Sequence, residues 1–306
     1  MKRSQIVDVT LRDGLMSHPQ VARSAKRELI RRLMSCGLRT FEAVRFPLDG
    51  KYSQFDDALE FLADIQEQRR CGGRIAAFAM GPDGVEEATR HHELFDEIHV
   101  PCFVSDSYAQ YAFGNWNWNC SLHFIESTLE LFHGTSVEVT VGLGTSFGCP
   151  IRRTHSILGT IERLGDLVTL GVNSVMLGDT AGTATPSLVM DTFQMLNGKR
   201  KPKVLRVHFH NTFGKALLNS YTAIAAGANA IDASLLGLGG EPHPYFVNPT
   251  MVDNGNCATE EVFEFLEAEA DTLSEDKSAL FETARWFASH LPGEIPCRSA
   301  FAEFVP

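Results

Sequence analysis

The sequence is short of positive charge. It has 27 lysine and arginine residues against 38 aspartate and glutamate residues, which gives a net charge of −11 at pH 7. Binding to the backbone of nucleic acids or to an anionic membrane surface depends on an excess of basic side chains. The composition therefore argues against both partners, although a local basic pocket could still hold a small anionic substrate.

Long apolar runs and paired cysteines are also absent. No stretch approaches the roughly 20 apolar residues that span a membrane, and the apolar run in residues 1–14 is too short for a secretory signal peptide. The seven cysteines are scattered and include no Cys-x-x-Cys pair, which argues against a zinc or disulfide framework. We therefore expect a cytoplasmic protein whose thiols are reduced.

Short apolar segments alternate with amphipathic segments along the chain. Expected strands are residues 5–10, 40–44, 74–80, 97–103, 137–143, 174–179, 205–210 and 230–237. Expected helices are residues 20–36, 54–70, 84–92, 120–133, 153–170, 186–197, 214–227, 259–271 and 275–290. This alternation predicts a parallel sheet.

Eight such units favour closure into an α/β (β/α)8 TIM barrel, a fold of about 250 residues. An open doubly wound sheet is the alternative, but it would want a glycine-rich turn after an early strand, and none is present. We expect one catalytic domain over residues 1–306. Its barrel core covers about 5–271, and an extra C-terminal helix and tail cover 272–306.

Active sites of this fold lie at the C-terminal ends of the strands. Polar residues gather there after at least five of the expected strands. They include Arg12, Asp13, Glu42, Arg45, Asp179, Thr180, His208 and His210. A barrel that serves only as a scaffold has no need for such a set, whereas a catalytic site has.

His208 and His210 lie two residues apart on one expected strand. Strand side chains alternate between faces, so both imidazoles point one way while Val207 and Phe209 point the other. The pair is either a polar patch or half of a metal site, and Asp13 at the same rim favours the metal. Such a mixed nitrogen and oxygen site suits Mg, Mn, Co or Zn.

Three charged residues near the rim have competing interpretations. Arg12 and Asp13 are adjacent in an expected strand and should point to opposite faces, which leaves Arg12 to neutralise a developing enolate oxygen. Glu42 and Asp179 occupy strand positions typical of core residues, and buried carboxylates need partners. Structural pairing and direct proton transfer remain equally open for these two.

Seven motifs occur in the order found in one known family. They are "VDVTLRDGL", "FEAVRF", "FGCP", "LGDTAGTATP", "VHFHNTFGKALLN", "GLGG" and "GNCATEE". Over about residues 5–270, the sequence resembles the 3-hydroxy-3-methylglutaryl-CoA lyase-like members of the DRE-TIM metallolyase superfamily. The chain is shorter than those of the isopropylmalate and homocitrate synthases, which carry extra domains.

The resemblance implies a divalent metal, Mg²⁺ or Mn²⁺, and a retro-Claisen or retro-aldol cleavage. The implied metal ligands are Asp13, His208, His210 and the amide oxygen of Asn256. The implied catalytic residues are Arg12, Glu42, Asp179 and His208. A base removes the proton of a tertiary hydroxyl group, the carbon–carbon bond breaks, and the leaving enolate is protonated.

Three positions depart from the family pattern. Glu241 replaces a loop cysteine that serves the proton step, and the loop after it is about six residues longer. Met16 replaces a glutamine, and Arg45 replaces a small residue. Glu241 can act as the acid/base only if burial raises its pKa. Arg45 could bind a carboxylate or phosphate, so we expect Arg45, Met16 and Thr180 to contact the substrate.

These features favour a metal-dependent carbon–carbon lyase for a 3-hydroxy acid or its CoA thioester, with altered specificity. The reverse chemistry gives a second hypothesis, an aldolase or a Claisen-type condensing enzyme. A metal-binding barrel without catalysis is the third. The expected partners are a small-molecule substrate and further copies of this chain in a homodimer or larger homo-oligomer.

Overall fold

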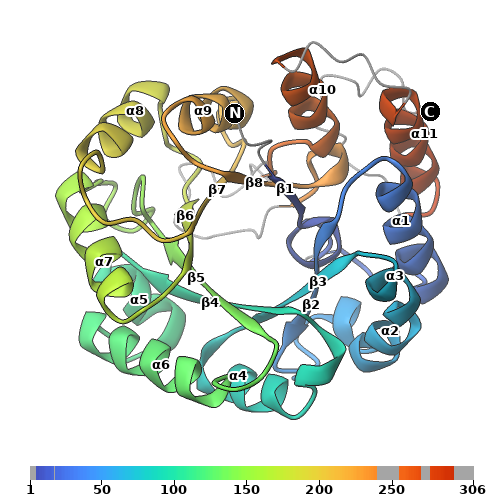
Figure 1. The fold of residues 1–306 in the computed structure, drawn as a ribbon, viewed down its shortest axis with the longest axis horizontal. Coiled ribbons are helices and arrows are strands. Elements are labelled where there is room, and N and C mark those ends of the chain that lie inside the picture. The colour runs from blue at the N-terminus through green and yellow to red at the C-terminus, as the bar shows by residue number, and fades with distance from the viewer. Residues whose placement is uncertain (1–4, 17, 240–254, 270–275, 293–306) are drawn as a thin grey trace.

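Eight parallel strands close into a barrel in the order β1 to β8, with helices around the outside (Figure 1). The computed structural model describes residues 5–16, 18–239, 255–269 and 276–292. The strands are Gln5–Asp8, Thr40–Phe46, Arg74–Ala79, Glu97–Phe103, Glu138–Gly144, Ser174–Asp179, Val204–Phe209 and Ala230–Ala233. The predicted (β/α)8 barrel is therefore confirmed.

The outer layer contains the expected helices and one that was not expected. Helices α1 to α6 are Arg23–Ser35, Ala58–Asp64, Gln66–Arg70, Gly81–Thr89, Asp106–Phe113 and Trp118–Leu131. Helices α7 to α11 are Ile157–Thr169, Pro186–Met195, Ala216–Ala225, Thr259–Glu269 and Asp276–Ala288. No helix in the described part of the chain is both long and apolar enough to cross a membrane.

Two helix predictions were wrong in detail. The single helix expected over residues 54–70 is divided at Ile65 into α2 and α3. Helix α5 was missed, although Ser105 accepts a hydrogen bond from the backbone N–H of Tyr108 and Gly114 ends the helix with φ of 78°. Both capping signals are present in the sequence, but the eight-residue helix is too short to show a clear periodicity.

The first strand ends earlier than expected. It ends at Asp8, and Thr10–Gly14 form a single π-type turn in which the N–H groups of Asp13 and Gly14 both donate to the carbonyl of Val9. A side chain at Gly14 would place its Cβ 2.5 Å from Ser234 Oγ, so the close approach of this turn to the segment after β8 requires glycine. The turn, rather than a strand, carries Arg12 and Asp13.

Strand β2 contains a bulge that changes which side chains face the barrel interior. Glu42 pairs with Ala76 of β3, but Val44 pairs with the very next residue, Ala77, so Ala43 is an extra residue. A strand without the bulge would place residues 42 and 45 on opposite faces. With the bulge, Arg45 pairs with Phe78 of β3, and the side chains of both residues line one cavity in the barrel.

Asp8 joins β1 to the start of α10. It lies at the end of β1 and accepts hydrogen bonds from the hydroxyl groups of Thr10 and Thr259, 3.0 Å each, and from the backbone N–H of Thr10. Burial raises the pKa of Asp8 to about 6, and these hydrogen bonds only partly oppose that shift.

Replacement of Asp8 by asparagine should remove part of the pH dependence of stability. Because the native pKa lies above the unfolded value of 3.8, Asp8 stabilises the fold at low pH and loses this contribution as pH rises through about 6. The free energy of unfolding of the wild type, relative to Asp8→Asn, should fall by about 2 kcal/mol between pH 4 and 7.5. Urea unfolding at a series of pH values measures it.

The exposed Asp56→Asn variant serves as the control, since its carboxylate lies in solvent. Its pH profile should follow that of the wild type. An Asp8→Asn profile parallel to the wild type over this range would contradict the prediction.

Candidate metal centre and active site

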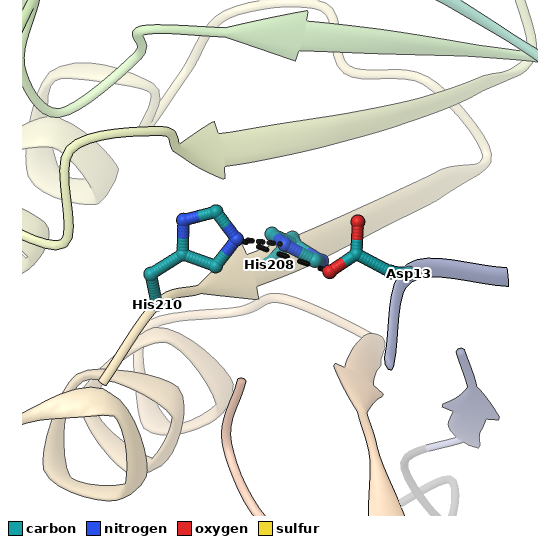
Figure 2. Close-up of side chains that lie close together, drawn as sticks. All are labelled: Asp13, His208 and His210. Carbon is teal, nitrogen blue, oxygen red and sulfur yellow. Dashed lines mark hydrogen bonds and ion pairs between the residues drawn. The ribbon is translucent and has the colours of Figure 1, made fainter. Parts of the chain in front are cut away.

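Three potential ligands meet at the C-terminal end of the barrel. The ligand atoms of Asp13, His208 and His210 all lie within 4.8 Å of one another (Figure 2). The Nε2 atoms of the two histidines are 3.1 Å apart, and His210 Nε2 is 4.0 Å from Asp13 Oδ2. The prediction that both imidazoles point the same way is confirmed.

The other ring nitrogens fix which atoms of the histidines face each other. Nδ1 of His208 lies 3.1 Å from Asp232 Oδ2, and Nδ1 of His210 lies 3.2 Å from the carbonyl oxygen of Thr180. Because both partners are acceptors, each Nδ1 carries a proton, and each Nε2 is the atom left to bind a second proton or a cation. Two lone pairs 3.1 Å apart repel unless a proton or a cation lies between them.

The pKa values of the two histidines are shifted in opposite directions. Burial opposes protonation of His208, but its hydrogen bond with Asp232 and the charge of Asp13 outweigh burial and raise its pKa. Burial, followed by the charge of His208, lowers the pKa of His210 to about 4. His210 is therefore a neutral imidazole at neutral pH, the form that binds metals.

Asn256 lies beside these three residues. Its Nδ2 donates to Asp13 Oδ2 at 2.6 Å and to the carbonyl of Leu238, while within the described part of the chain its buried Oδ1 has no hydrogen-bond partner. Burial opposes ionisation of Asp13, but Arg12 and the two histidines outweigh it and lower its pKa to about 2. An ionised carboxylate, two imidazole lone pairs and a free amide oxygen fit a divalent cation.

Arg12 lies directly beside this group, and one prediction about it was wrong. Its Nη1 forms an ion pair of 2.5 Å with Asp13 Oδ1, whereas the sequence predicted that the two would point apart. The reason is the π-type turn, which replaces the expected strand and so removes the alternation of faces. Arg12 Nε also pairs with Glu42, and its guanidinium lies 4.5 Å over the ring of Phe78.

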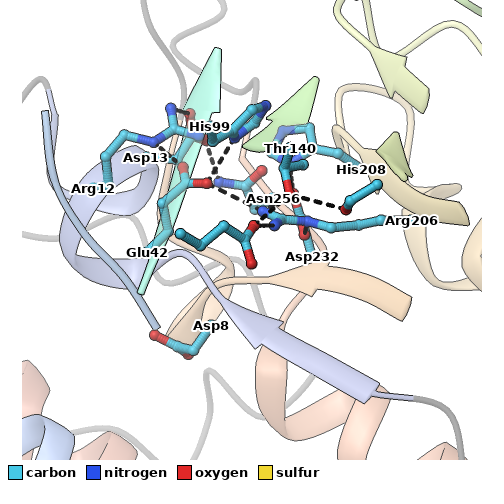
Figure 3. A network of polar contacts seen from close by, with 12 residues as sticks. Asp8, Arg12, Asp13, Glu42, His99, Thr140, Arg206, His208, Asp232 and Asn256 are labelled. Carbon is cyan, nitrogen blue, oxygen red and sulfur yellow. Dashed lines mark hydrogen bonds and ion pairs between the residues drawn. The ribbon is translucent and has the colours of Figure 1, made fainter. Parts of the chain in front are cut away.

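A buried charge network lies under the site (Figure 3). Arg206 is 2% exposed and forms ion pairs with Asp232, with Glu42 at 3.1 Å and with Glu97 at 3.3 Å. Burial opposes ionisation of Glu42, but Arg12, His99 and Arg206 outweigh it and hold the pKa of its carboxyl well below the ordinary value. Glu42 is therefore an ionised pairing partner, which favours the structural interpretation of this residue.

A cavity of about 230 Å³ opens above the network and beside the metal ligands. Its wall includes eight of the residues of interest: Arg12, Asp13, Met16, Arg45, His99, Thr180, His208 and His210. Arg45 and Lys51 enter from one side, and both cations lie over the ring of Tyr52, at 5.0 and 4.8 Å. Phe78, Phe103 and Met176 supply an apolar part of the wall, between these two basic side chains and the candidate metal ligands.

Asp179 and Thr180 are neighbours in sequence but have different places in the site. Thr180 lines the cavity, and its carbonyl orients His210. Asp179 does not line the cavity and accepts hydrogen bonds from the N–H groups of Thr183 and Ala184, which fixes the turn after β6. Burial raises the pKa of Asp179 to about 7. Glu241 lies outside the described residues.

The sequence reasoning missed the inner residues Glu97, His99, Arg206 and Asp232. Signals for them were present, because Arg206 precedes His208 by two positions and therefore shares its strand face. Glu97 and His99 likewise alternate within an otherwise apolar strand. An ionisable residue at every second position of a buried strand indicates a polar barrel interior.

Comparison of the sequence with known proteins identifies one family. A family model described as HMGL-like matches residues 3–286. The mitochondrial hydroxymethylglutaryl-CoA lyase of Macaca fascicularis is 28% identical over 276 residues, which cover 87% of this chain and 79% of that protein.

Two solved structures extend the likeness to three dimensions. The hydroxymethylglutaryl-CoA lyase of Pseudomonas aeruginosa is 26% identical, covers 99% of this chain and 98% of its own, and superposes with a TM-score of 0.86. An HMG-CoA lyase from Acinetobacter baumannii, in complex with coenzyme A and 3-methylmalate, is 25% identical with a TM-score of 0.83 and covers 98% and 94% of the two chains.

Replacement of Arg206 by methionine should destabilise the barrel strongly. The substitution keeps an apolar stem but leaves Asp232, Glu42 and Glu97 as buried carboxylates without their shared cation. Loss of one partner of a buried ion pair costs about 3 to 5 kcal/mol. Chemical unfolding of the purified variant measures the loss.

Arg90→Met is the matched control, since Arg90 pairs with Glu86 on the surface of α4 with both side chains more than half exposed. It should change the free energy of unfolding by less than about 1 kcal/mol. Equal effects of the two substitutions would refute the role given to Arg206.

Proposed function

The chain belongs to the HMGL-like family, and from that premise we propose that it is a divalent-metal-dependent carbon–carbon lyase. It cleaves a 3-hydroxy acid or a 3-hydroxyacyl-CoA by a retro-Claisen or retro-aldol route through an enolate. The observation that carries the proposal is the pair of imidazole Nε2 atoms that face each other 3.1 Å apart, beside Asp13 and Arg12 at the barrel rim.

Asp13, His208, His210 and Asn256 are the proposed ligands of Mg²⁺ or Mn²⁺. A bound cation would polarise the hydroxyl group of the substrate and stabilise the keto product. Asp232 and the carbonyl of Thr180 hold the two imidazoles in the required tautomer, a role that partners of metal ligands commonly have. Zn²⁺ and Co²⁺ are compatible with the same donor atoms.

Arg12 and His208 are the residues proposed to act on the reacting atoms. Within the described residues, Nη2 of Arg12 has no hydrogen-bond partner, while Nε and Nη1 are fixed by Glu42 and Asp13. A guanidinium held in this way can neutralise an enolate oxygen without losing its proton. His208 lines the cavity and would hold the hydroxyl group in place through the cation. Its Nδ1 proton is held by Asp232 and its Nε2 lone pair would serve the cation, so the hydroxyl proton passes to water in the cavity.

The cavity suggests a substrate with a second negative group. Arg45 and Lys51 lie on the cavity wall, and Met16 and Thr180 line it as well. Arg45 Nη1 contacts Asp49 and the carbonyl of Pro47, which leaves its other nitrogens for a ligand. A hydroxy acid bound in the relative from Acinetobacter baumannii supports a hydroxy dicarboxylic acid as the substrate class.

Removal of the metal should abolish cleavage. After dialysis against EDTA, the protein should lose activity on a panel of 3-hydroxy acids, 3-hydroxyacyl-CoA thioesters and 4-hydroxy-2-oxo acids, followed by mass spectrometry. Added Mg²⁺ or Mn²⁺ should restore it.

His210→Ala should weaken Mn²⁺ binding, measured by calorimetry, by at least about tenfold, since loss of even a residue that supports a metal ligand typically costs 10- to 100-fold.

The exposed His92→Ala variant should bind Mn²⁺ like the wild type, because its imidazole lies far from the ligand group on the surface. Wild-type protein that binds neither Mg²⁺ nor Mn²⁺ would exclude the proposed mechanism.

Replacement of Arg45 by glutamine should alter substrate choice. The variant should lose about 10- to 100-fold in kcat/KM on hydroxy dicarboxylic acids, because a charge-assisted hydrogen bond contributes about 1.5 to 3 kcal/mol. Monocarboxylic acids should be affected little. The measurement is the ratio of kcat/KM between the two substrate groups, with Arg70→Gln on the surface as the control. An unchanged ratio would show that Arg45 does not recognise the substrate.

A further inference from the structure

His99 is a buried imidazole that no step above uses. It lies in β4, is 1% exposed and belongs to the cavity wall. Its Nδ1 is 2.7 Å from Glu42 Oε2, so the carboxylate accepts the Nδ1 proton (Figure 3). This pairing leaves Nε2 as the functional end of the ring.

Nε2 of His99 has no hydrogen-bond partner among the residues that the structure describes. It occupies the space over Gly142 of β5, where an added Cβ would lie 2.3 Å from it, and Gly142 also lines the cavity. The ring is held edge-on against Phe78, with centroids 5.2 Å apart. A buried polar atom without a partner is rare, and here it belongs to a residue of the cavity wall whose ring is fixed by Glu42 and Phe78.

The surroundings of His99 resemble those of a histidine that transfers protons. Glu42 faces Nδ1 from β2 and is held ionised by Arg12 of the π-type turn and by Arg206 of β7. Glu97, on the same strand as His99, is paired with Arg206. A carboxylate on Nδ1 fixes the orientation of the ring and the tautomer of its neutral form, which leaves Nε2 as the atom that exchanges a proton.

We propose that His99 is the catalytic residue that protonates the enolate carbon, with Glu42 as its positioning residue. This role rests on the proposed lyase function. The sequence made Glu241 a conditional candidate for the proton step, and the dyad of His99 and Glu42 is an alternative within the described residues.

The proton balance is closed. The electron pair of the broken carbon–carbon bond becomes the double bond of the enolate, and the same carbon then forms a bond to the Nε2 proton of His99. The proton that the substrate hydroxyl gave up returns to His99 through water in the cavity. In the reverse direction, neutral His99 removes a proton from the carbon next to the carbonyl group.

Solvent exchange tests His99 without knowledge of the full substrate. The Mg²⁺-loaded protein in D₂O should exchange the methyl protons of pyruvate or acetyl-CoA, which NMR follows, and should cleave members of the substrate panel. His99→Ala should lose at least about 100-fold in exchange and cleavage, the usual contribution of a general acid or base. Its Mn²⁺ affinity should stay unchanged, and added imidazole should restore exchange.

His123→Ala, a change at an exposed histidine of α6, should keep wild-type exchange and gain nothing from imidazole. Rescue by imidazole separates proton transfer from a packing role, which imidazole would not restore. Folded His99→Ala that exchanges within about threefold of the wild type, or that imidazole fails to rescue, overturns the proposal. The proposal is also overturned if Glu241→Gln loses exchange while His99→Ala keeps it.

A wild-type protein that neither exchanges nor cleaves any probe would overturn the lyase function, and the role of His99 with it. That outcome is visible in the wild type before any variant is compared. The two failures are therefore distinguishable.

Discussion

The site depends on the pairing of charges inside the barrel, where water does not screen them. Arg206 forms ion pairs with Asp232 and Glu42, Asp232 sets the tautomer of His208, and Glu42 fixes Arg12 and His99. In a low-dielectric interior each of these groups would be costly alone, so each position constrains the next. The rim side chains are thus oriented by a network that lies one layer below them.

This arrangement divides the barrel interior into two parts. The lower part is a set of ion pairs around Arg206 and Glu42, and among the described residues Nε2 of His99 beside them has no hydrogen-bond partner. In the upper part, Arg12, Asp13 and the two histidines line one cavity, and the buried Oδ1 of Asn256 beside them has no hydrogen-bond partner among the described residues. Preorganised groups of this kind need little rearrangement when charge develops on a substrate.

Much of the fold and of the metal ligand group could be predicted from sequence because both follow simple periodicities. Strand alternation places His208 with His210, and eight repeated units close the barrel. The pairing of Arg12 with Asp13 could not be predicted, since the π-type turn depends on packing between Gly14 and Ser234 from distant parts of the chain. The partners of Glu42 could not be predicted for the same reason, because they come from β4 and β7.

The extra residue in β2 has a consequence for how this scaffold can change. Glu42 lies before Ala43 and serves the internal charge network, whereas Arg45 lies after it and faces the cavity. The residues of β2 before the bulge and those after it therefore follow two separate patterns of alternation between the two faces of the sheet. A substitution at residue 45 can alter what the cavity accepts while the register that holds Glu42 stays intact. Removal of Ala43 would abolish the bulge and still leave Arg45 opposite Phe78, because Val44 would then directly follow Glu42 along β3.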